Sequence, residues 1–146
     1  MLYIDTSVLL VYTLTQAVER GRYRYTEKFL AKVTEGSLSV ATSFYALHEL
    51  YIFAIDNAPN FQVGAGYGKA ALEKILALPL QILPLVTRGE RTRHARMFSA
   101  LRDASDVPHA IAALVYGCEA IVAYDDHFAA ITSIIPHTRP EDYVEM

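Results

Sequence analysis

The feature that most constrains this chain is its first apolar run, Leu-Tyr-Ile at residues 2–4, which is followed directly by Asp5, Thr6 and Ser7. A short apolar run bounded by residues that begin helices predicts a buried strand with Asp5 at its C-terminal end. Open parallel sheets bind ligands outside the carboxyl ends of their strands. We therefore expect Asp5 at a binding edge, as the first of four carboxylates that gather around a divalent metal.

The rest of the sequence alternates between helical and strand patterns. Helices are expected at about residues 6–21, 23–35, 43–55, 69–77 and 87–102, from 105 onward and from 139 onward; strands are expected at 38–41, 80–85, 120–124 and 134–135. Thr87 and Glu90 have the spacing of a capping box. Residues 56–68 hold three glycines and a proline and predict a loop, interpreted as a mobile flap, with a change to helix partway through as the alternative. Strands alternating with helices predict an α/β fold with a mostly parallel central sheet of four to five short strands flanked by helices.

The bulk properties predict one domain spanning residues 1–146. Of the 146 residues, 53% are hydrophobic and 20% are charged, which supplies enough apolar surface to offset the entropy cost of folding. A net charge of -3 neither supports nor excludes a nucleic-acid partner. The one cysteine, Cys118, excludes an internal disulfide and a cysteine-cluster metal site. No apolar run reaches about 18 residues, so we expect a soluble, cytoplasmic protein without a membrane partner.

Four acidic residues are expected to approach one another at the edge of this sheet. Asp5 and Asp125 follow predicted strands, Asp106 stands at the start of a predicted helix, and Glu49 lies beside the apolar stripe of another helix. Carboxylates within a few ångströms of one another repel, so a cluster of them needs a cation to stay ionised. Such oxygen ligands select Mg²⁺ or Mn²⁺, which activate a water molecule and hold a phosphate group. The expected substrate is a phosphodiester.

Four short motifs occur in order along the chain. They are Tyr-Ile-Asp-Thr-Ser-Val-Leu at residues 3–9, Ser-Phe-Tyr-Ala-Leu-His-Glu-Leu at 43–50, Asp-Val-Pro-His-Ala-Ile-Ala at 106–112 and Ile-Val-Ala-Tyr-Asp-Asp-His-Phe at 121–128, with Pro-Glu-Asp-Tyr closing the series at 140–143. Over nearly its whole length the chain thereby resembles the PIN-domain ribonucleases, and most closely the VapC-type toxins. The resemblance implies a PIN-like three-layer fold and a metal-dependent endoribonuclease that leaves 5′-phosphate and 3′-hydroxyl ends. It also implies a homodimer that is often inhibited by a small antitoxin protein.

The resemblance also implies roles for particular residues. Those that match the acidic quartet of the family, as catalytic residues and ligands of Mg²⁺ or Mn²⁺, are Asp5, Glu49, Asp106 and Asp125. Thr6 or Ser7 would then hold the Asp5 carboxylate or a metal-bound water, and Asp126 is a spare acid beside the last ligand. The chain departs from the family at Ala123, where a threonine or serine is often found, so one supporting hydrogen bond is lost or supplied elsewhere.

Each acid also has an interpretation that needs no metal. Asp5 is a favoured helix cap, Glu49 is of a type usually found on helix surfaces, and Asp106 would stabilise a helix N-terminus through the helix dipole. The histidines near these acids are interpreted as structural residues rather than metal ligands: His48, His109 and His127.

Two basic stretches are candidate RNA contacts. Residues 20–25 interleave arginines with tyrosines and include Arg22 and Arg24, and the helix expected after Thr87 carries Arg91 and Arg93. Guanidinium groups attract the phosphates of RNA and stack on unpaired bases. The alternatives are a solvated helix face or a contact with an antitoxin or a second copy of the chain.

Three other functions remain open at the level of the sequence. A phosphatase of the haloacid-dehalogenase type would need a second acid two residues after Asp5, where Ser7 stands. A PIN-like nuclease that processes RNA without an antitoxin would carry the same acids. A catalytically idle PIN-like binding module would have no reason to retain a repulsive set of carboxylates.

Overall fold

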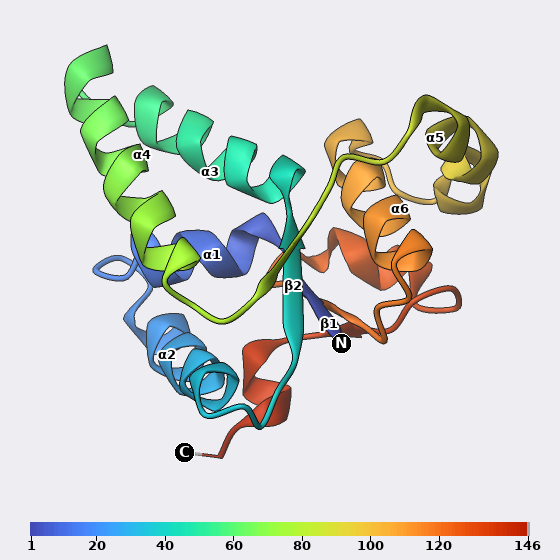
Figure 1. The fold of residues 1–146 in the computed structure, drawn as a ribbon, viewed down its shortest axis with the longest axis horizontal. Coiled ribbons are helices and arrows are strands. Elements are labelled where there is room, and N and C mark those ends of the chain that lie inside the picture. Colours follow the sequence, from blue (N-terminus) through green and yellow to red (C-terminus); the bar gives the residue numbers. More distant parts are fainter. Residues whose placement is uncertain (146) are drawn as a thin grey trace.

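A parallel β-sheet forms the middle layer of the computed structural model, which describes residues 1–145 (Figure 1). Its strands are β1 (Leu2–Ile4), β2 (Val40–Ser43), β3 (Gln81–Leu83), β4 (Ile121–Val122) and β5 (His137–Thr138). They lie in the order β3-β2-β1-β4-β5, and every pair is parallel. The predicted α/β fold with a mostly parallel sheet is confirmed, and β3 takes an edge position as its flanking prolines require.

Helices cover both faces of this sheet (Figure 1). The α-helices are α1 (Thr6–Thr13), α2 (Arg20–Thr34), α3 (Phe44–Asp56), α4 (Phe61–Leu76), α5 (Arg88–His94) and α6 (Val107–Val115). Short 3₁₀ helices are η1 (Ala95–Phe98), η2 (Ala104–Asp106), η3 (Asp126–Ile131) and η4 (Pro140–Tyr143). Helices α1 to α4 lie on one side of the sheet, and α5 and α6 lie on the other. No helix among residues 1–145 is both long and apolar enough to cross a membrane.

The two faces of the sheet enclose separate apolar cores because side chains alternate along each strand. Leu2 and Ile4 pack on the side of α1 to α4, whereas Tyr3 between them packs on the side of α6. On β4, Val122 and Ile121 divide in the same way. The central strands are therefore buried on both faces, which is why their sequences are almost continuously apolar.

Several element boundaries differ from the predicted ones. Helix α1 ends at Thr13, not near residue 21, because the amides of Leu14 and Thr15 both donate to the carbonyl of Leu10 and close the last turn. Strand β2 begins at residue 40 rather than 38 and ends at 43, and β4 spans two residues rather than five. Helix α5 ends at residue 94 and continues only as η1 to residue 98, not to 102.

The last strand was predicted at the wrong residues. The amides of Ile134 and Ile135 both donate to the carbonyl of Ile131, so these apolar residues form a turn. The edge strand β5 is the polar pair His137 and Thr138 instead. An edge strand faces solvent, so a polar dipeptide gives no apolar signal from which to find it.

The flap interpretation of residues 56–68 is wrong, because the segment turns into helix partway, which was the alternative, and most of it belongs to α4. Asn60 caps this helix by accepting a hydrogen bond from the amide of Val63 at 2.9 Å. The glycines lie where α4 packs against α3. A Cβ at Gly64 would come within 2.6 Å of the Cα of Ile55, and one at Gly68 would come within 2.6 Å of the Tyr51 ring. These glycines therefore permit close helix packing and do not mark a loop.

Replacement of Gly64 should separate α3 from α4. We expect Gly64→Ala to lower the free energy of unfolding by about 1 to 3 kcal/mol, because its methyl group meets backbone that cannot move aside. Gly66→Ala is the matched control: no atom lies within 4 Å of a Cβ there, so it should raise the stability by about 0.5 to 1 kcal/mol. Urea denaturation measures both, and equal effects would contradict this role for Gly64.

Candidate metal and active site

The central strands end beside one another, and a serine hydroxyl ties two of these ends together. Asp5 follows β1, and Tyr124 and Asp125 follow the adjacent β4. The Ser7 hydroxyl donates to Asp5 Oδ2 at 2.7 Å and accepts from the backbone amide of Tyr124 at 3.0 Å. Ser7 therefore fixes the Asp5 carboxylate against the strand end that carries Asp125.

Asp5 is the N-cap of α1, which is the interpretation of this residue that needs no metal. Its Oδ2 accepts from the Ser7 amide at 3.1 Å, which satisfies a free N–H of the first turn. The side chain is nearly fully buried, and Oδ1 receives no hydrogen bond from residues 1–145. Capping and metal binding are thus compatible, since the cap uses one oxygen and leaves the other available.

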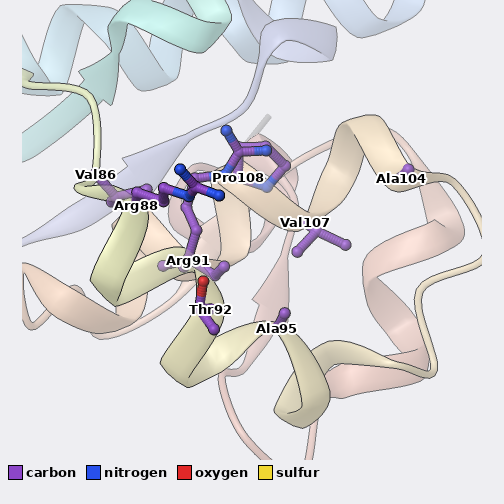
Figure 2. Close-up of a pocket in the computed structure, with 9 residues that line it drawn as sticks. Val86, Arg88, Arg91, Thr92, Ala95, Ala104, Val107 and Pro108 are labelled. Atoms are coloured by element: carbon purple, nitrogen blue, oxygen red, sulfur yellow. The ribbon is translucent and has the colours of Figure 1, made fainter.

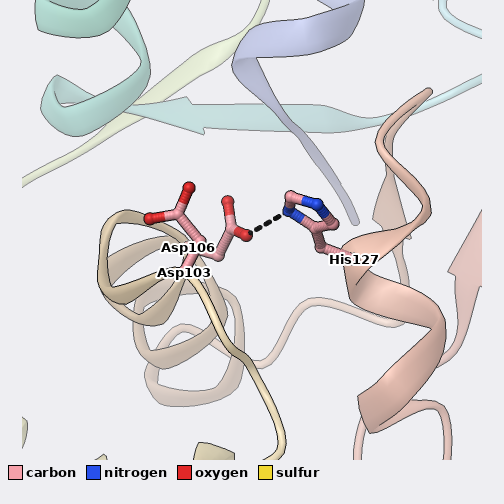
Figure 3. Close-up of side chains that lie close together, drawn as sticks. All are labelled: Asp103, Asp106 and His127. Carbon is pink, nitrogen blue, oxygen red and sulfur yellow. Dashed lines mark hydrogen bonds and ion pairs between the residues drawn. The ribbon is translucent and has the colours of Figure 1, made fainter.

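The His127 ring contacts both Asp106 and Asp125, and Figure 3 shows it beside Asp106. His127 Nδ1 lies 3.0 Å from Asp106 Oδ2 and 3.2 Å from Asp125 Oδ1. Asp125 also caps η3, because its Oδ1 accepts from the His127 amide at 2.8 Å. Asp106 stands before α6 but makes no capping hydrogen bond with its side chain. Its carboxylate is therefore directed to the strand ends and not to its own helix.

Glu49 reaches the same region from α3. Thr6 Oγ1 donates to Glu49 Oε1 at 3.2 Å, and His109 Nε2 donates to the same oxygen. His109 is fully buried, and its Nδ1 lies 3.8 Å from Asp5 Oδ1. One histidine thus lies between Asp5 and Glu49, as His127 lies between the other two acids.

Tyr3 anchors His109 from within the sheet. Its hydroxyl lies 2.6 Å from His109 Nδ1 and 2.6 Å from Ser43 Oγ, and all three residues are buried. Burial, opposed in part by the hydrogen bond to Ser43, raises the pKa of Tyr3, so its hydroxyl stays protonated. A continuous hydrogen-bonded chain therefore connects β2 and β1 to the carboxylate of Glu49.

The acids raise one another's proton affinity. Burial raises the pKa of Asp106 to about 6; the hydrogen bond from His127 opposes this increase, and the charges of Asp125, Asp103 and Asp5 add to it. Burial alone would lower the pKa of His109, but the hydrogen bond to Glu49 and the nearby carboxylates outweigh burial and raise it. The hydrogen bond to Asp106 and the charge of Asp125 likewise raise the pKa of His127, so both histidines are placed to carry positive charge that offsets part of this repulsion.

The donor set fits a hard divalent cation. Each of Asp5, Asp106 and Asp125 uses one carboxylate oxygen in hydrogen bonds with the described residues and leaves the other oxygen without one. Oxygen ligands whose positions are fixed in this way suit Mg²⁺ or Mn²⁺. Among residues 1–145, the group whose ligand atoms lie within 4.8 Å of one another is Asp103, Asp106 and His127 (Figure 3). The four predicted carboxylates face one region but do not themselves form such a group.

No protein-family model matches the sequence, and no curated protein sequence is significantly similar to it. Solved structures, however, are similar to the fold. The toxin VapC20 of Mycobacterium tuberculosis, which cleaves the sarcin-ricin loop, superposes with a TM-score of 0.65 at 16% identity, over 89% of this chain and 94% of that chain. VapBC2 of Rickettsia felis, bound to a DNA fragment from its promoter, superposes with a TM-score of 0.64 at 16% identity, over 95% and 98%. The chain has the PIN-like fold of VapC toxins.

The VapC fold brings some of the predicted site residues together and separates others. Asp126 points away, since its carboxylate accepts a hydrogen bond from Arg139 at 2.7 Å. Ala123 is fully buried and offers no hydroxyl; the hydrogen bonds that hold Asp5 come from Ser7 instead. The predicted metal ligands stay a prediction, because the fold alone does not assign their roles.

The predicted arginines are distributed unevenly. Arg22 lines a pocket of 250 Å³ together with Ser7 and Asp125, and its guanidinium lies 4.8 Å from the centre of the Tyr124 ring. Arg91 lines another pocket, beside α6. Arg24 and Arg93 are exposed side chains. Arg22 is therefore the predicted RNA contact that lies nearest to the acids along a common pocket.

Sequence reasoning missed three residues at this site. His109 and His127 were interpreted as structural, yet each pairs with two of the predicted acids. Their spacing offered a signal: His109 lies one helical turn after Asp106, and His127 follows Asp125 by two residues. Asp103 gave no signal, because its position depends on η2, a turn that the sequence did not predict.

Loss of the Tyr3 hydroxyl should destabilise the protein. Tyr3→Phe leaves Ser43 Oγ and His109 Nδ1 buried without this partner, so we expect a loss of about 1 to 3 kcal/mol in the free energy of unfolding. The control is Tyr143→Phe, whose hydroxyl bonds to Thr138 at 3.0 Å in a partly exposed position and should cost less. Urea denaturation compares the two variants. A smaller loss of unfolding free energy for Tyr3→Phe than for Tyr143→Phe would contradict the role of the buried hydrogen bonds of Tyr3.

Asp106 should make stability depend on pH. A carboxyl group whose pKa is higher in the folded chain binds more protons there, so stability falls as pH rises from about 4 to 6. In the presence of a chelator, we expect Asp106→Asn to be more stable than the parent at pH 7.5 by about 1 kcal/mol, after allowance for solvent screening. The difference should vanish near pH 4.

The control for this measurement is Asp126→Asn, because the hydrogen bond from Arg139 lowers the pKa of Asp126. A lowered pKa gives stability that is present at neutral pH and lost on acidification, so this variant should gain nothing at pH 7.5. Thermal denaturation across this pH range tests both variants. An Asp106→Asn protein no more stable than the parent at any pH would refute the effect of burial and neighbouring charge.

Proposed function

We propose that this protein is a metal-dependent endoribonuclease that hydrolyses RNA phosphodiester bonds with a metal-activated water. The observation that carries the proposal is that Asp5 and Asp125 follow the adjacent strands β1 and β4, while Asp106 shares His127 with Asp125. Each of these acids has a carboxylate oxygen free of hydrogen bonds from the described residues. Glu49 completes the acidic set from α3. These residues would hold Mg²⁺ or Mn²⁺.

The bound cation would supply Lewis acidity, which lowers the pKa of a water molecule and neutralises charge on the phosphate. The chain's own residues provide orientation. Ser7 fixes Asp5, while Thr6 and His109 fix Glu49, and carboxylates held in this way lose little freedom when a ligand binds. Arg22, on the pocket next to Asp125, is placed to attract the phosphates of the RNA strand.

We further propose that the protein is the toxin of a toxin–antitoxin pair, acting in the cytoplasm as a homodimer. The support is the likeness in fold to VapC20, a toxin that cleaves the sarcin-ricin loop, and to VapBC2, which binds DNA from its promoter. A small antitoxin protein is the partner expected on this basis. The apolar side chains exposed on α4, Phe61 and Tyr67 among them, leave surface for such contacts.

The test is cleavage of single-stranded and structured RNA in Mn²⁺ and in EDTA. We expect activity in Mn²⁺ only, and a loss of more than about a hundredfold in Asp5→Asn and Asp125→Asn, since loss of a ligand exceeds the 10- to 100-fold cost of losing a supporting residue. Asp126→Asn, whose side chain points to Arg139, should keep the parent activity.

Calorimetric titration with Mn²⁺ provides the second readout. Binding by the parent that is lost in Asp5→Asn and retained in Asp126→Asn supports the metal site. Cleavage indifferent to EDTA and to both ligand substitutions would refute the proposed reaction. Absence of Mn²⁺ binding together with absence of cleavage would instead indicate a PIN-like binding module.

A further inference from the structure

Two pockets that share Pro108 lie on the side of the molecule where Glu49 is found, and only one of them is lined by arginines. The first, here called the apolar pocket, has a volume of 570 Å³ and is walled by Phe44, Tyr45, Leu85 and Pro108. The second, the arginine pocket, has a volume of 650 Å³ and includes Arg88, Arg91 and the same Pro108 (Figure 2). Both volumes are in the range of small-molecule sites. Glu49 lines the apolar pocket, so the candidate metal site and both pockets form one continuous surface.

The apolar pocket presents large hydrophobic side chains to solvent. Phe44 is 52% exposed and Leu85 is 59% exposed. Leaving such surface in contact with water costs roughly 25 cal/mol for each Å². Scattered exposed hydrophobic residues need no explanation, but here an aromatic ring and a leucine share one concave site with Tyr45 and Pro108. The pocket therefore suits a flat apolar group.

The wall of the apolar pocket is held in place by the fold. The amide of Val86 donates to the Tyr45 hydroxyl at 3.2 Å, which ties the segment after β3 to the start of α3. The Thr87–Glu90 capping box fixes the following turn, as the sequence predicted. Leu85 lies next to this anchored position. The pocket is consequently formed before any ligand arrives, so binding orders few side chains.

The arginine pocket carries uncompensated positive charge. No carboxylate among residues 1–145 lies within ion-pair distance of Arg88 or Arg91. Figure 2 shows both side chains extending from α5 toward Pro108, the residue shared with the apolar pocket. Their guanidinium groups are available for a phosphate.

We propose that these two pockets form a subsite for one unpaired nucleotide of the RNA substrate, an assignment that rests on the proposed function. The base stacks on Phe44 in the apolar pocket, and an adjacent phosphate binds Arg88 and Arg91. Bases stack on aromatic side chains, and guanidinium groups bind phosphates, so one nucleotide satisfies both pockets. The subsite would hold the strand beside Glu49, and it predicts a preference for RNA that is unpaired next to the cleaved bond.

A helical peptide fits these pockets less well. An amphipathic helix needs a continuous apolar groove for anchors at i, i+3, i+4 and i+7. Beyond Pro108 the arginine pocket combines apolar side chains such as Val107 with two guanidinium groups, which an apolar anchor would cover without satisfying them. An aromatic wall in one pocket beside two guanidinium groups in the next instead matches the alternation of base and phosphate along a nucleic-acid strand.

The test measures the affinity for fluorescein-labelled single-stranded RNA octanucleotides by fluorescence anisotropy in EDTA, so that binding is read without cleavage. Homopolymers of adenosine, cytidine and uridine serve as probes. We expect Phe44→Ala to weaken binding about tenfold, in keeping with the loss of one stacked base. Arg91→Gln should weaken binding for every sequence and reduce its dependence on salt.

The matched controls are Phe61→Ala and Arg102→Gln. Phe61 is the first residue of α4, as Phe44 is of α3, and is 67% exposed away from the two pockets. Arg102 is an exposed arginine that does not line the arginine pocket. Both should bind RNA like the parent. Melting temperatures check that all four variants are folded.

The outcomes separate the subsite from the proposed reaction. Weakened binding by Phe44→Ala, with no cleavage by the parent in Mn²⁺, supports the subsite and refutes the reaction. If Phe44→Ala cleaves RNA with an unchanged KM and binds the octanucleotides with unchanged affinity, the subsite is refuted and the proposed reaction stands. A parent that binds none of the octanucleotides overturns the proposal, as does a Phe44→Ala variant whose oligomeric mass changes while its RNA affinity does not, which would indicate a protein interface.

Discussion

The site of this protein depends on the repulsion between carboxylates that the fold brings to one edge of its sheet. Asp5 and Asp125 are delivered by adjacent parallel strands, and Asp106 arrives from the first turn before α6. Burial and these neighbouring charges raise the pKa of Asp106 to about 6. Much of the local structure can be understood as a response to this cost, because serine, threonine and histidine side chains hold the acids in place.

The hydrogen bonds around the acids also connect the helices on one face of the sheet with those on the other. Tyr3 lies in the core on the side of α6, and its hydroxyl forms hydrogen bonds with Ser43 at the end of β2 and with His109. His109 in turn forms a hydrogen bond with Glu49 of α3. Helix α3 is in turn held against α4 by the close approach at Gly64. Packing far from the site therefore helps to set the position of Glu49, the acid that does not follow a strand.

The two sides of the site carry different side chains. Arg22 lies on the pocket that contains Ser7 and Asp125, and the apolar and arginine pockets lie on the side of Glu49. A strand of nucleic acid lying across the acids would thus meet a cation on one side and a base-binding surface with two arginines on the other. This arrangement gives an acidic centre the positive surroundings that a polyanionic substrate needs, although the net charge of the chain is -3.

The sequence by itself determined the class of fold, the order of the central elements and the acids at their ends, because buried strands and helix starts leave strong local signals at residues such as Asp5 and Ser43. Local signals gave the wrong structure at Gly64, where the glycine allows α4 to pack closely against α3 rather than forming a loop, and at the polar strand β5. Only the tertiary structure decided that His109 and His127 each lie between two acids, and that the apolar and arginine pockets share Pro108. These relations join residues distant in sequence, and no periodicity or cap encodes them.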